Sequence, residues 1–418
     1  MEDNVSKIGH CGFTNIGNTC YMNSVLQLIF HNEHILSFIL SKKNPFQEGG
    51  TMKSEYDNYL LQGGMLRLAE KKRRDEKLSN DYEITINRTE IDRFIETSII
   101  RELSKIANII IYKGNSEITP QHIKKIFDYK IPVLRGFSQQ DSHELLINML
   151  DIITDETGIE SEPEINNIPQ IIRDFISFMQ TSNKKIKSTD NIEEKRQILE
   201  EINKFKRQHG ELYYKYEGLN YMVKIFRNRY NPLIFKMKTF IFVKRTCNNC
   251  GDQSCIFENT PVISLDIIDS DINNCFNFMI RPEEVDYKCQ ICENTTATRI
   301  TKIWRPGMFL FVHLKRFKMM PNGRIMKIDI PIDVPFELDL NRYCDESMKT
   351  DTSISYKYTL KGFINHYGGY NGGHYTADCI SIADRETWFN YNDSSISKYN
   401  GNQINTSNAY ILMYELIV

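Results

Sequence analysis

The sequence predicts an α+β protein in which a largely helical N-terminal part precedes a strand-rich C-terminal part. Apolar residues recur at helical spacing just after residue 20, at Met22, Val25, Leu26 and Ile29. Residues 239–265 and 300–340 are instead rich in β-branched and aromatic side chains, which favour strands. Within the second range, Asn322-Gly323 predicts a tight turn between two hairpin strands.

The composition is that of an ordinary globular protein. The chain has 418 residues, of which 41% are hydrophobic and 25% charged, so it can bury a large core without disulfides. A net charge of -2 gives no general attraction to nucleic acid or to an anionic membrane. No apolar run approaches the ~18–20 residues that span a bilayer, and residues 1–10 lack the apolar core of a secretion signal. We therefore expect a cytoplasmic or nuclear protein without membrane or nucleic-acid partners. We also expect a monomer, although the composition does not bear on this point.

Cysteines in such a compartment are usually reduced, and they serve as metal ligands, nucleophiles or small core residues. Four of the ten cysteines form two pairs, each with two residues between the thiols. This spacing lets one turn aim both sulfurs at one ion, and two such turns complete a tetrahedron. The pattern predicts one structural zinc ion per chain, held by Cys247, Cys250, Cys289 and Cys292. Four unrelated thiols are the alternative interpretation.

Cys20 stands apart from these pairs. The turn residues Gly17 and Asn18 precede it and the helical pattern follows it, which places Cys20 at a loop-to-helix junction. The N-terminus of a helix stabilises an anion and lowers the pKa of a thiol. Cys20 is therefore a candidate nucleophile, and a buried structural cysteine is the alternative.

A nucleophilic cysteine needs a base and a group that orients the base. His374 follows a glycine-rich segment and directly precedes a predicted strand at 375–380. A second predicted strand begins at Trp388 and could pair antiparallel with the first. That pairing would place Asn392 or Asp393 beside His374, where either residue could accept the imidazole N–H. A plain turn at Asn392-Asp393 is the alternative.

Taken together, these segments resemble the ubiquitin-specific protease family of deubiquitinating cysteine proteases. The matching stretches occur in the family's order over residues 11–416, at Gly12–Gln27, Gln139–Leu146, Phe311–Phe317, His366–Tyr375 and Tyr410–Glu415. Phe13 stands where the family usually has Leu. The resemblance implies a papain-like cysteine protease fold of the USP type, with a helical thumb bearing the cysteine, a β-rich palm bearing the histidine, and zinc-binding β fingers.

The resemblance also implies roles for individual residues. Cys20 matches the nucleophile, and His374 matches the general base that later acts as the acid. Asn392 matches the third catalytic position, Asp393 follows it, and the resemblance leaves open which of the two dominates. Asn15 matches the side chain of the oxyanion hole, which would act together with the Cys20 backbone N–H.

A single catalytic domain is expected over residues 11–418, after a short extension at 1–10. Its expected parts are a thumb at 11–153, a charged helical insertion at 155–232, fingers at 233–300 and a palm at 301–418. The insertion, with a helix expected near 191–208, either packs on the domain or binds a partner. The basic cluster Lys71-Lys72-Arg73-Arg74 is interpreted as a solvated helix face, with a nuclear signal as the alternative.

The function implied is thiol-dependent hydrolysis of isopeptide or peptide bonds after the C-terminal glycine of ubiquitin, with ubiquitin or ubiquitinated proteins as partners. Three alternatives remain: a protease for another ubiquitin-like modifier, a non-catalytic ubiquitin-binding adaptor, and a zinc-ribbon nucleic-acid module. His143 lies on a helix expected to open at Ser138, and it is a further candidate base or a structural residue of the cleft.

Overall fold

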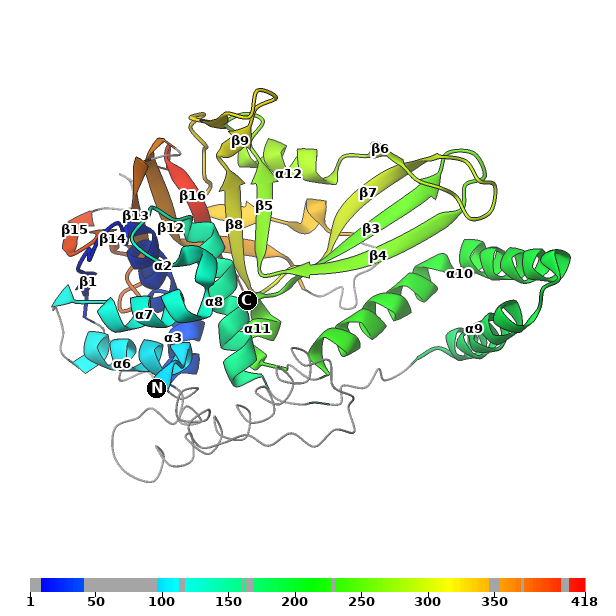
Figure 1. Ribbon diagram of the computed structural model, residues 1–418, viewed down its shortest axis with the longest axis horizontal. Coiled ribbons are helices and arrows are strands. Elements are labelled where there is room, and N and C mark those ends of the chain that lie inside the picture. Colours follow the sequence, from blue (N-terminus) through cyan, green and yellow to red (C-terminus); the bar gives the residue numbers. More distant parts are fainter. Residues whose placement is uncertain are drawn as a thin grey trace.

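The computed structural model describes residues 9–40, 96–112, 117–158, 161, 168–227, 230–345, 354–369, 372–399 and 406–417. The basic cluster at 71–74 lies outside these residues. Helices from the N-terminal part pack against one end of a large mixed sheet, and a second sheet extends away from it (Figure 1). None of the helices in the described ranges combines the length and the apolar character needed to cross a membrane.

The helical part is built around α2 (Cys20–Phe30), all of whose residues are buried. Four helices that follow it in the sequence complete this part: α3 (Glu33–Leu40), α6 (Ile99–Tyr112), α7 (Gln121–Lys130) and α8 (Ser142–Thr157). The last of these begins at Ser142 and not at the expected Ser138. The reason is local, because the Asp141 side chain caps the helix by accepting a hydrogen bond from the His143 N–H.

The large sheet has eight strands, in the order β15-β14-β13-β12-β16-β8-β5, with β11 paired to β12. In chain order they are β5 (Val262–Asp266), β8 (Phe309–Lys315), β11 (Glu337–Asp339), β12 (Lys357–Gly369), β13 (Gly372–Ile380), β14 (Trp388–Asn392), β15 (Ser395–Tyr399) and β16 (Ala409–Leu416). All pairings are antiparallel except that of β5 with β8.

Both faces of this sheet are buried. In β8, Phe309 and Phe311 join the core shared with the helices, whereas Leu310, Val312 and Leu314 join a second core on the other face. Side chains alternate between the faces of a strand, so an unbroken apolar run is required where both faces are covered. The second core is closed by α12 (Ile272–Ile280). This double burial gives the strands that carry His374 and Asn392 a rigid support.

A four-stranded antiparallel sheet, in the order β4-β3-β7-β6, extends away from the helices (Figure 1). Its strands are β3 (Thr239–Cys247), β4 (Gln253–Thr260), β6 (Glu283–Asp286) and β7 (Thr296–Arg305). Short elements complete the fold: β1 (Gly12–Phe13) pairs with β2 (Glu117–Ile118), α11 (Pro232–Met237) precedes β3, and β9 (Phe317–Met319) pairs with β10 (Ile325–Lys327). The last pair is the predicted hairpin, and Gly323 supplies the positive φ of +77° in its turn.

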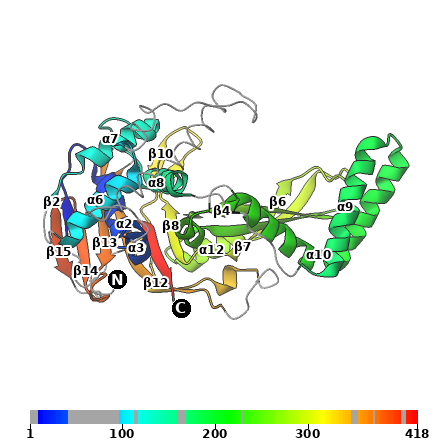
Figure 2. The same ribbon diagram turned by 90° about the horizontal axis from the view of Figure 1, so that it is seen from below.

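Two long helices lie beside this second sheet (Figure 2). They are α9 (Gln170–Ser188) and α10 (Ile192–Phe226), and the Asn191 side chain caps the second one. The helix expected near 191–208 is therefore present but continues to Phe226, with a non-helical residue at His209. Gly218 lets α10 approach the sheet closely, because a Cβ there would lie 2.8 Å from the Trp304 ring. At least this end of the insertion packs on the domain.

Candidate active site

Cys20 is the first residue of α2 and is buried, with 3% of its surface exposed. The two preceding turn residues, Gly17 and Asn18, have positive φ values of 118° and 51°, which glycine and asparagine tolerate. The expected loop-to-helix junction is therefore confirmed. Because Cys20 opens the helix, its backbone N–H has no carbonyl partner within the helix and stays available to a ligand.

His374 and Asn392 lie on the neighbouring antiparallel strands β13 and β14, as the sequence predicted. Nε2 of His374 lies 2.7 Å from Oδ1 of Asn392. An amide oxygen can only accept, so Nε2 carries the hydrogen and Nδ1 is the basic nitrogen of the neutral ring. Tyr375, next to His374, makes a backbone hydrogen bond to the Cys20 thiol. The structure thus brings Cys20, His374 and Asn392 to one place.

The Asp393 side chain forms hydrogen bonds with different residues from those that Asn392 contacts. Its Oδ2 accepts a hydrogen bond of 2.9 Å from Nδ2 of Asn15, and its Oδ1 accepts one of 2.8 Å from Nδ2 of Asn23. Asp393 has a φ of 51°, so the backbone turns sharply at the end of β14. Adjacent residues of one turn therefore contact two different catalytic candidates, His374 and Asn15.

The Asn15 side chain is fixed at both of its polar atoms. Its Oδ1 accepts from the backbone N–H groups of Gly17 and Thr19, at 3.0 and 3.2 Å. Its Nδ2 gives one hydrogen to Asp393, so the second hydrogen of the amide can serve a ligand. Asn15 is exposed, which leaves this donor accessible from solvent.

Burial raises the pKa of the Cys20 thiol above its ordinary value of 9.0. A backbone hydrogen bond from Tyr375 lowers this pKa by less, and the negative charge of Asp393 raises it further. The backbone N–H groups of Cys20 and Tyr21 at the start of the helix do lower this pKa, as expected, but desolvation is the larger effect and the net shift is upward. The resting group is a thiol, which needs a base in order to react.

Two contacts at this site have no counterpart in the sequence analysis. Gln139 donates through Nε2 to the Gly373 carbonyl and accepts from the Gly373 N–H, both at 2.7 Å. This pair joins the segment before α8 to the residue before His374. The second contact is the hydrogen bond from Nδ2 of Asn23 to Oδ1 of Asp393. Both contacts link residues far apart in the chain, and no local spacing or periodicity indicates them.

His143 takes no part in the contacts described above for Cys20 and His374. Its ring stacks on His313, with centroids 3.7 Å apart, and both rings lie near the Ser264 hydroxyl. Burial lowers the pKa of both histidines. This arrangement favours the structural interpretation of His143 over that of a second base.

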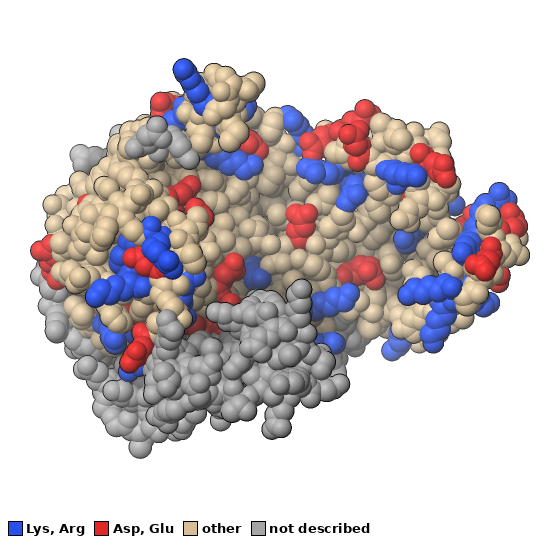
Figure 3. Space-filling model, viewed as in Figure 1, with Lys and Arg blue, Asp and Glu red and all other residues tan. Residues whose placement is uncertain are grey.

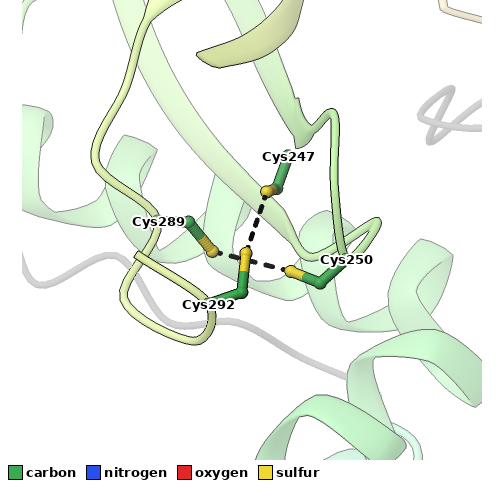
Figure 4. A group of neighbouring side chains, drawn as sticks. All are labelled: Cys247, Cys250, Cys289 and Cys292. Carbon is green, nitrogen blue, oxygen red and sulfur yellow. Dashed lines mark hydrogen bonds between the residues drawn. The ribbon is translucent and has the colours of Figure 1, made fainter. Parts of the chain in front are cut away.

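The two cysteine pairs meet at the far end of the second sheet, where β3 ends (Figure 4). The ligand atoms of Cys247, Cys250, Cys289 and Cys292 all lie within 4.8 Å of one another. Two of the sulfur–sulfur distances are 3.6 Å. A tetrahedral zinc site with Zn–S bonds of about 2.3 Å places its sulfurs ~3.8 Å apart, so the residues fit such an ion.

A hollow lies between the second sheet and the end of the large sheet. Apolar residues of β3 and β4, including Ile241, Val243 and Ile256, form its floor, with charged residues such as Glu258 and Arg299 among them. Acidic and basic side chains are interspersed over this face of the molecule, and neither sign dominates it (Figure 3). The hollow can therefore receive a large surface with mixed apolar and polar character.

The sequence profile described as "Ubiquitin carboxyl-terminal hydrolase" matches residues 11–414. The chain belongs to the ubiquitin carboxyl-terminal hydrolase family. A probable ubiquitin carboxyl-terminal hydrolase of Acanthamoeba polyphaga mimivirus is 24% identical over 434 residues, which cover 99% of this chain and 92% of that protein. Ubiquitin carboxyl-terminal hydrolase 21 of Homo sapiens is also 24% identical, over 98% of this chain but only 62% of the human protein.

Solved structures show the same fold. The SAGA Ubp8/Sgf11/Sus1/Sgf73 DUB module bound to ubiquitin aldehyde matches with a TM-score of 0.61 and 19% identity, covering 100% of this chain and 71% of that chain. These comparisons confirm the predicted ubiquitin carboxyl-terminal hydrolase family, the α+β fold of the USP type and the class of cysteine-type deubiquitinase.

Proposed function

We propose that this chain hydrolyses isopeptide or peptide bonds after the C-terminal glycine of ubiquitin, with Cys20 as nucleophile, His374 as base and Asn392 as the group that orients His374. The observation that carries the proposal is the hydrogen bond between His374 and Asn392 beside a cysteine that opens a helix. The family match over residues 11–414 supports the reaction class.

The proposed reaction begins when Nδ1 of His374 takes the Cys20 proton. The thiolate attacks the carbonyl carbon of the terminal glycine, and the carbonyl oxygen becomes an oxyanion. His374 then gives its proton to the departing lysine amine, and an acyl-thioester remains on Cys20. A water molecule, deprotonated by His374, attacks the thioester, and the thiol and a free carboxylate are released.

Asn15 and Asp393 act on the oxyanion in this proposal. The second Nδ2 hydrogen of Asn15 and the backbone N–H of Cys20 donate to it, and each such donor contributes about 2.7–4 kcal/mol of barrier reduction. Asp393 positions Asn15 through the 2.9 Å hydrogen bond. Asn392 is therefore the third catalytic residue, and Asp393 is a positioning residue of the oxyanion hole.

We assign the thumb to residues 11–153, the fingers to 233–300 and the palm to 301–418, with the 155–232 insertion between them. The apolar and charged hollow between the fingers and palm is the proposed site for the globular part of ubiquitin. The solved relative bound to ubiquitin aldehyde supports this assignment. We retain the monomeric state and the absence of a nucleic-acid partner as predictions.

Cys247, Cys250, Cys289 and Cys292 are proposed to hold one zinc ion. Four thiolate ligands leave no open coordination position, so the ion would stabilise the fingers and take no part in catalysis. In the described residues, all ten cysteines are free of disulfides. Cysteines without disulfides fit the reducing cytoplasm or nucleus that we propose as the location.

The test is hydrolysis of a ubiquitin–fluorophore conjugate by the wild type and by Cys20→Ala. We expect release of the fluorophore by the wild type only, with equal circular dichroism spectra for the two proteins. Unchanged turnover in the Cys20→Ala variant would contradict the proposal. Turnover of a conjugate of another ubiquitin-like modifier, with none of ubiquitin, would contradict the proposed substrate.

A further inference from the structure

A chain of hydrogen-bonded side chains lies behind β14, on the face opposite Asn392. Tyr391 directly precedes Asn392 and is 1% exposed. Its hydroxyl lies 2.7 Å from Nδ1 of His10 and 2.7 Å from Nε2 of His31. Nδ1 of His31 lies 2.8 Å from the backbone carbonyl of Gln27. One tyrosine thus connects two histidines that are distant in the sequence.

The donor and the acceptor of each hydrogen bond follow from the groups at the two ends of the network. The Gln27 carbonyl can only accept, so Nδ1 of His31 carries the hydrogen. Burial lowers the pKa of His31 to about 4, so its ring is neutral near pH 7 and Nε2 is an acceptor. Tyr391 therefore donates to His31, and the Tyr391 oxygen accepts from Nδ1–H of His10. All three hydrogen bonds can therefore form in one arrangement of the hydrogens.

This network joins the elements that carry the proposed catalytic residues. His31 directly follows the last residue of α2 as its C-cap, and α2 begins at Cys20. Tyr391 lies on β14, which ends at Asn392. His10 precedes β1 and stacks on Phe389, with ring centroids 3.7 Å apart. The network therefore links the helix of the nucleophile to the strand of the orienting residue.

The same N-terminal segment also contacts the turn that follows β14. The Phe13 N–H donates to the Asp393 carbonyl at 3.0 Å. A Cβ on Gly12 would lie 2.4 Å from the Ser394 carbonyl oxygen, so only glycine allows this approach. The segment from His10 to Phe13 thus contacts both β14, at Phe389, and the turn after it, at Asp393 and Ser394.

We propose that His31, Tyr391 and His10 are positioning residues that hold Asn392 in its place relative to Cys20. This inference rests on the proposed catalytic roles of Asn392 and Cys20. Tyr391 acts through its neighbour Asn392, since its own side chain points into the core. Without the hydroxyl, β14 loses its side-chain hydrogen bond to the end of α2, and the bond from Asn23 of α2 to Asp393 is left to fix this end of the strand from the other side. Shifts of about 1 Å suffice to slow an oriented reaction severely.

The test is steady-state hydrolysis of a ubiquitin–fluorophore conjugate by Tyr391→Phe, which keeps the ring and removes the hydroxyl. We expect kcat to fall by about tenfold while KM is unchanged, because the proposed ubiquitin surface is untouched. The double variant with Asn392→Ala should be no slower than Asn392→Ala alone, because Tyr391 acts through that residue.

Tyr414→Phe is the matched control. Tyr414 is fully buried on β16, and its hydroxyl donates to the Pro335 carbonyl at 2.8 Å. This variant should lose a similar amount of thermal stability and keep the wild-type kcat. If Tyr391→Phe fails to fold, His10→Ala at the outer end of the network should lower kcat to a smaller degree, again with KM unchanged.

Three results would overturn the inference and leave the proposed function intact. They are a wild-type kcat in Tyr391→Phe, an equal loss of kcat in Tyr414→Phe, and additive losses of kcat in the double variant with Asn392→Ala. An inactive wild type, or an Asn392→Ala variant with the wild-type rate, would instead contradict the proposed catalytic roles. Either result would also contradict the proposed effect of the network on catalysis.

Discussion

His374 and Asn392 lie on neighbouring strands, with Nε2 of the imidazole 2.7 Å from Oδ1 of the amide. The next residue, Asp393, turns its carboxylate to Asn15 and Asn23. These two adjacent residues therefore have different partners: Asn392 contacts His374, and Asp393 contacts Asn15 and Asn23. Under the proposed function, this difference gives the first two predictions.

Replacement of Asn392 by Ala removes the acceptor for Nε2–H, so the ring can rotate or carry its hydrogen on the wrong nitrogen. We expect kcat to fall about 10²- to 10⁴-fold, within the range of general acid–base contributions. Asn392→Asp keeps an acceptor and should retain most of the activity. Equal losses in both variants, measured with a ubiquitin–fluorophore conjugate, would contradict the orienting role.

Asn15→Ala removes one donor to the oxyanion and should lower kcat about 10²- to 10³-fold. Asp393→Asn replaces a carboxylate that accepts from two amides, so the Asn15 Nδ2 group loses a charged acceptor that holds it, and kcat should fall in the same direction. The two losses should not add in the double variant, because both residues act on one oxyanion. Additive losses would show that Asp393 acts elsewhere.

The raised pKa of Cys20 predicts slow alkylation of the free enzyme near pH 7. Below the pKa, the thiolate fraction and the rate rise tenfold per pH unit, and we expect no plateau below about pH 9. Asp393→Asn removes a negative charge that raises this pKa, so it should speed alkylation at pH 8. Mass spectrometry of the peptide that contains Cys20 measures the rate. A plateau below pH 7 would instead indicate a preformed thiolate.

Metal analysis of the purified protein should find about one zinc ion per chain. Cys289→Ser removes a fully buried ligand and should abolish zinc binding, whereas Cys255→Ser, on β4 outside the cluster, should keep it. Chelation should lower the unfolding temperature and spare the alkylation of Cys20, because the four cysteines lie at the far end of the second sheet, away from α2. Full stability in a zinc-free protein would rule out the structural role.

The features predicted from the sequence are those set by local spacing. Each cysteine pair is determined by one turn, and the β13–β14 pairing follows from two short apolar runs separated by turn residues. The helix start at Cys20 likewise follows from the turn residues Gly17 and Asn18. In each case, the deciding residues lie within a few positions of one another.

The remaining features depend on contacts between distant parts of the chain. The choice between Asn392 and Asp393 depends on the partner of Asp393, Asn15, which lies 378 residues away. The pKa of Cys20 is set chiefly by burial under other elements, which a local helix pattern does not report. The link between His31 and Tyr391 spans 360 residues. Tertiary packing alone determines such contacts.

The central claim is that Cys20 attacks the C-terminus of ubiquitin. Incubation of the wild type and of Cys20→Ala with ubiquitin that bears a C-terminal thiol-reactive group tests this most directly, with intact mass and peptide mapping as the readout. We predict an adduct of one ubiquitin on the wild type, mapped to Cys20, and no adduct on the variant. An adduct on another cysteine, or none on a folded wild-type protein, would contradict the account.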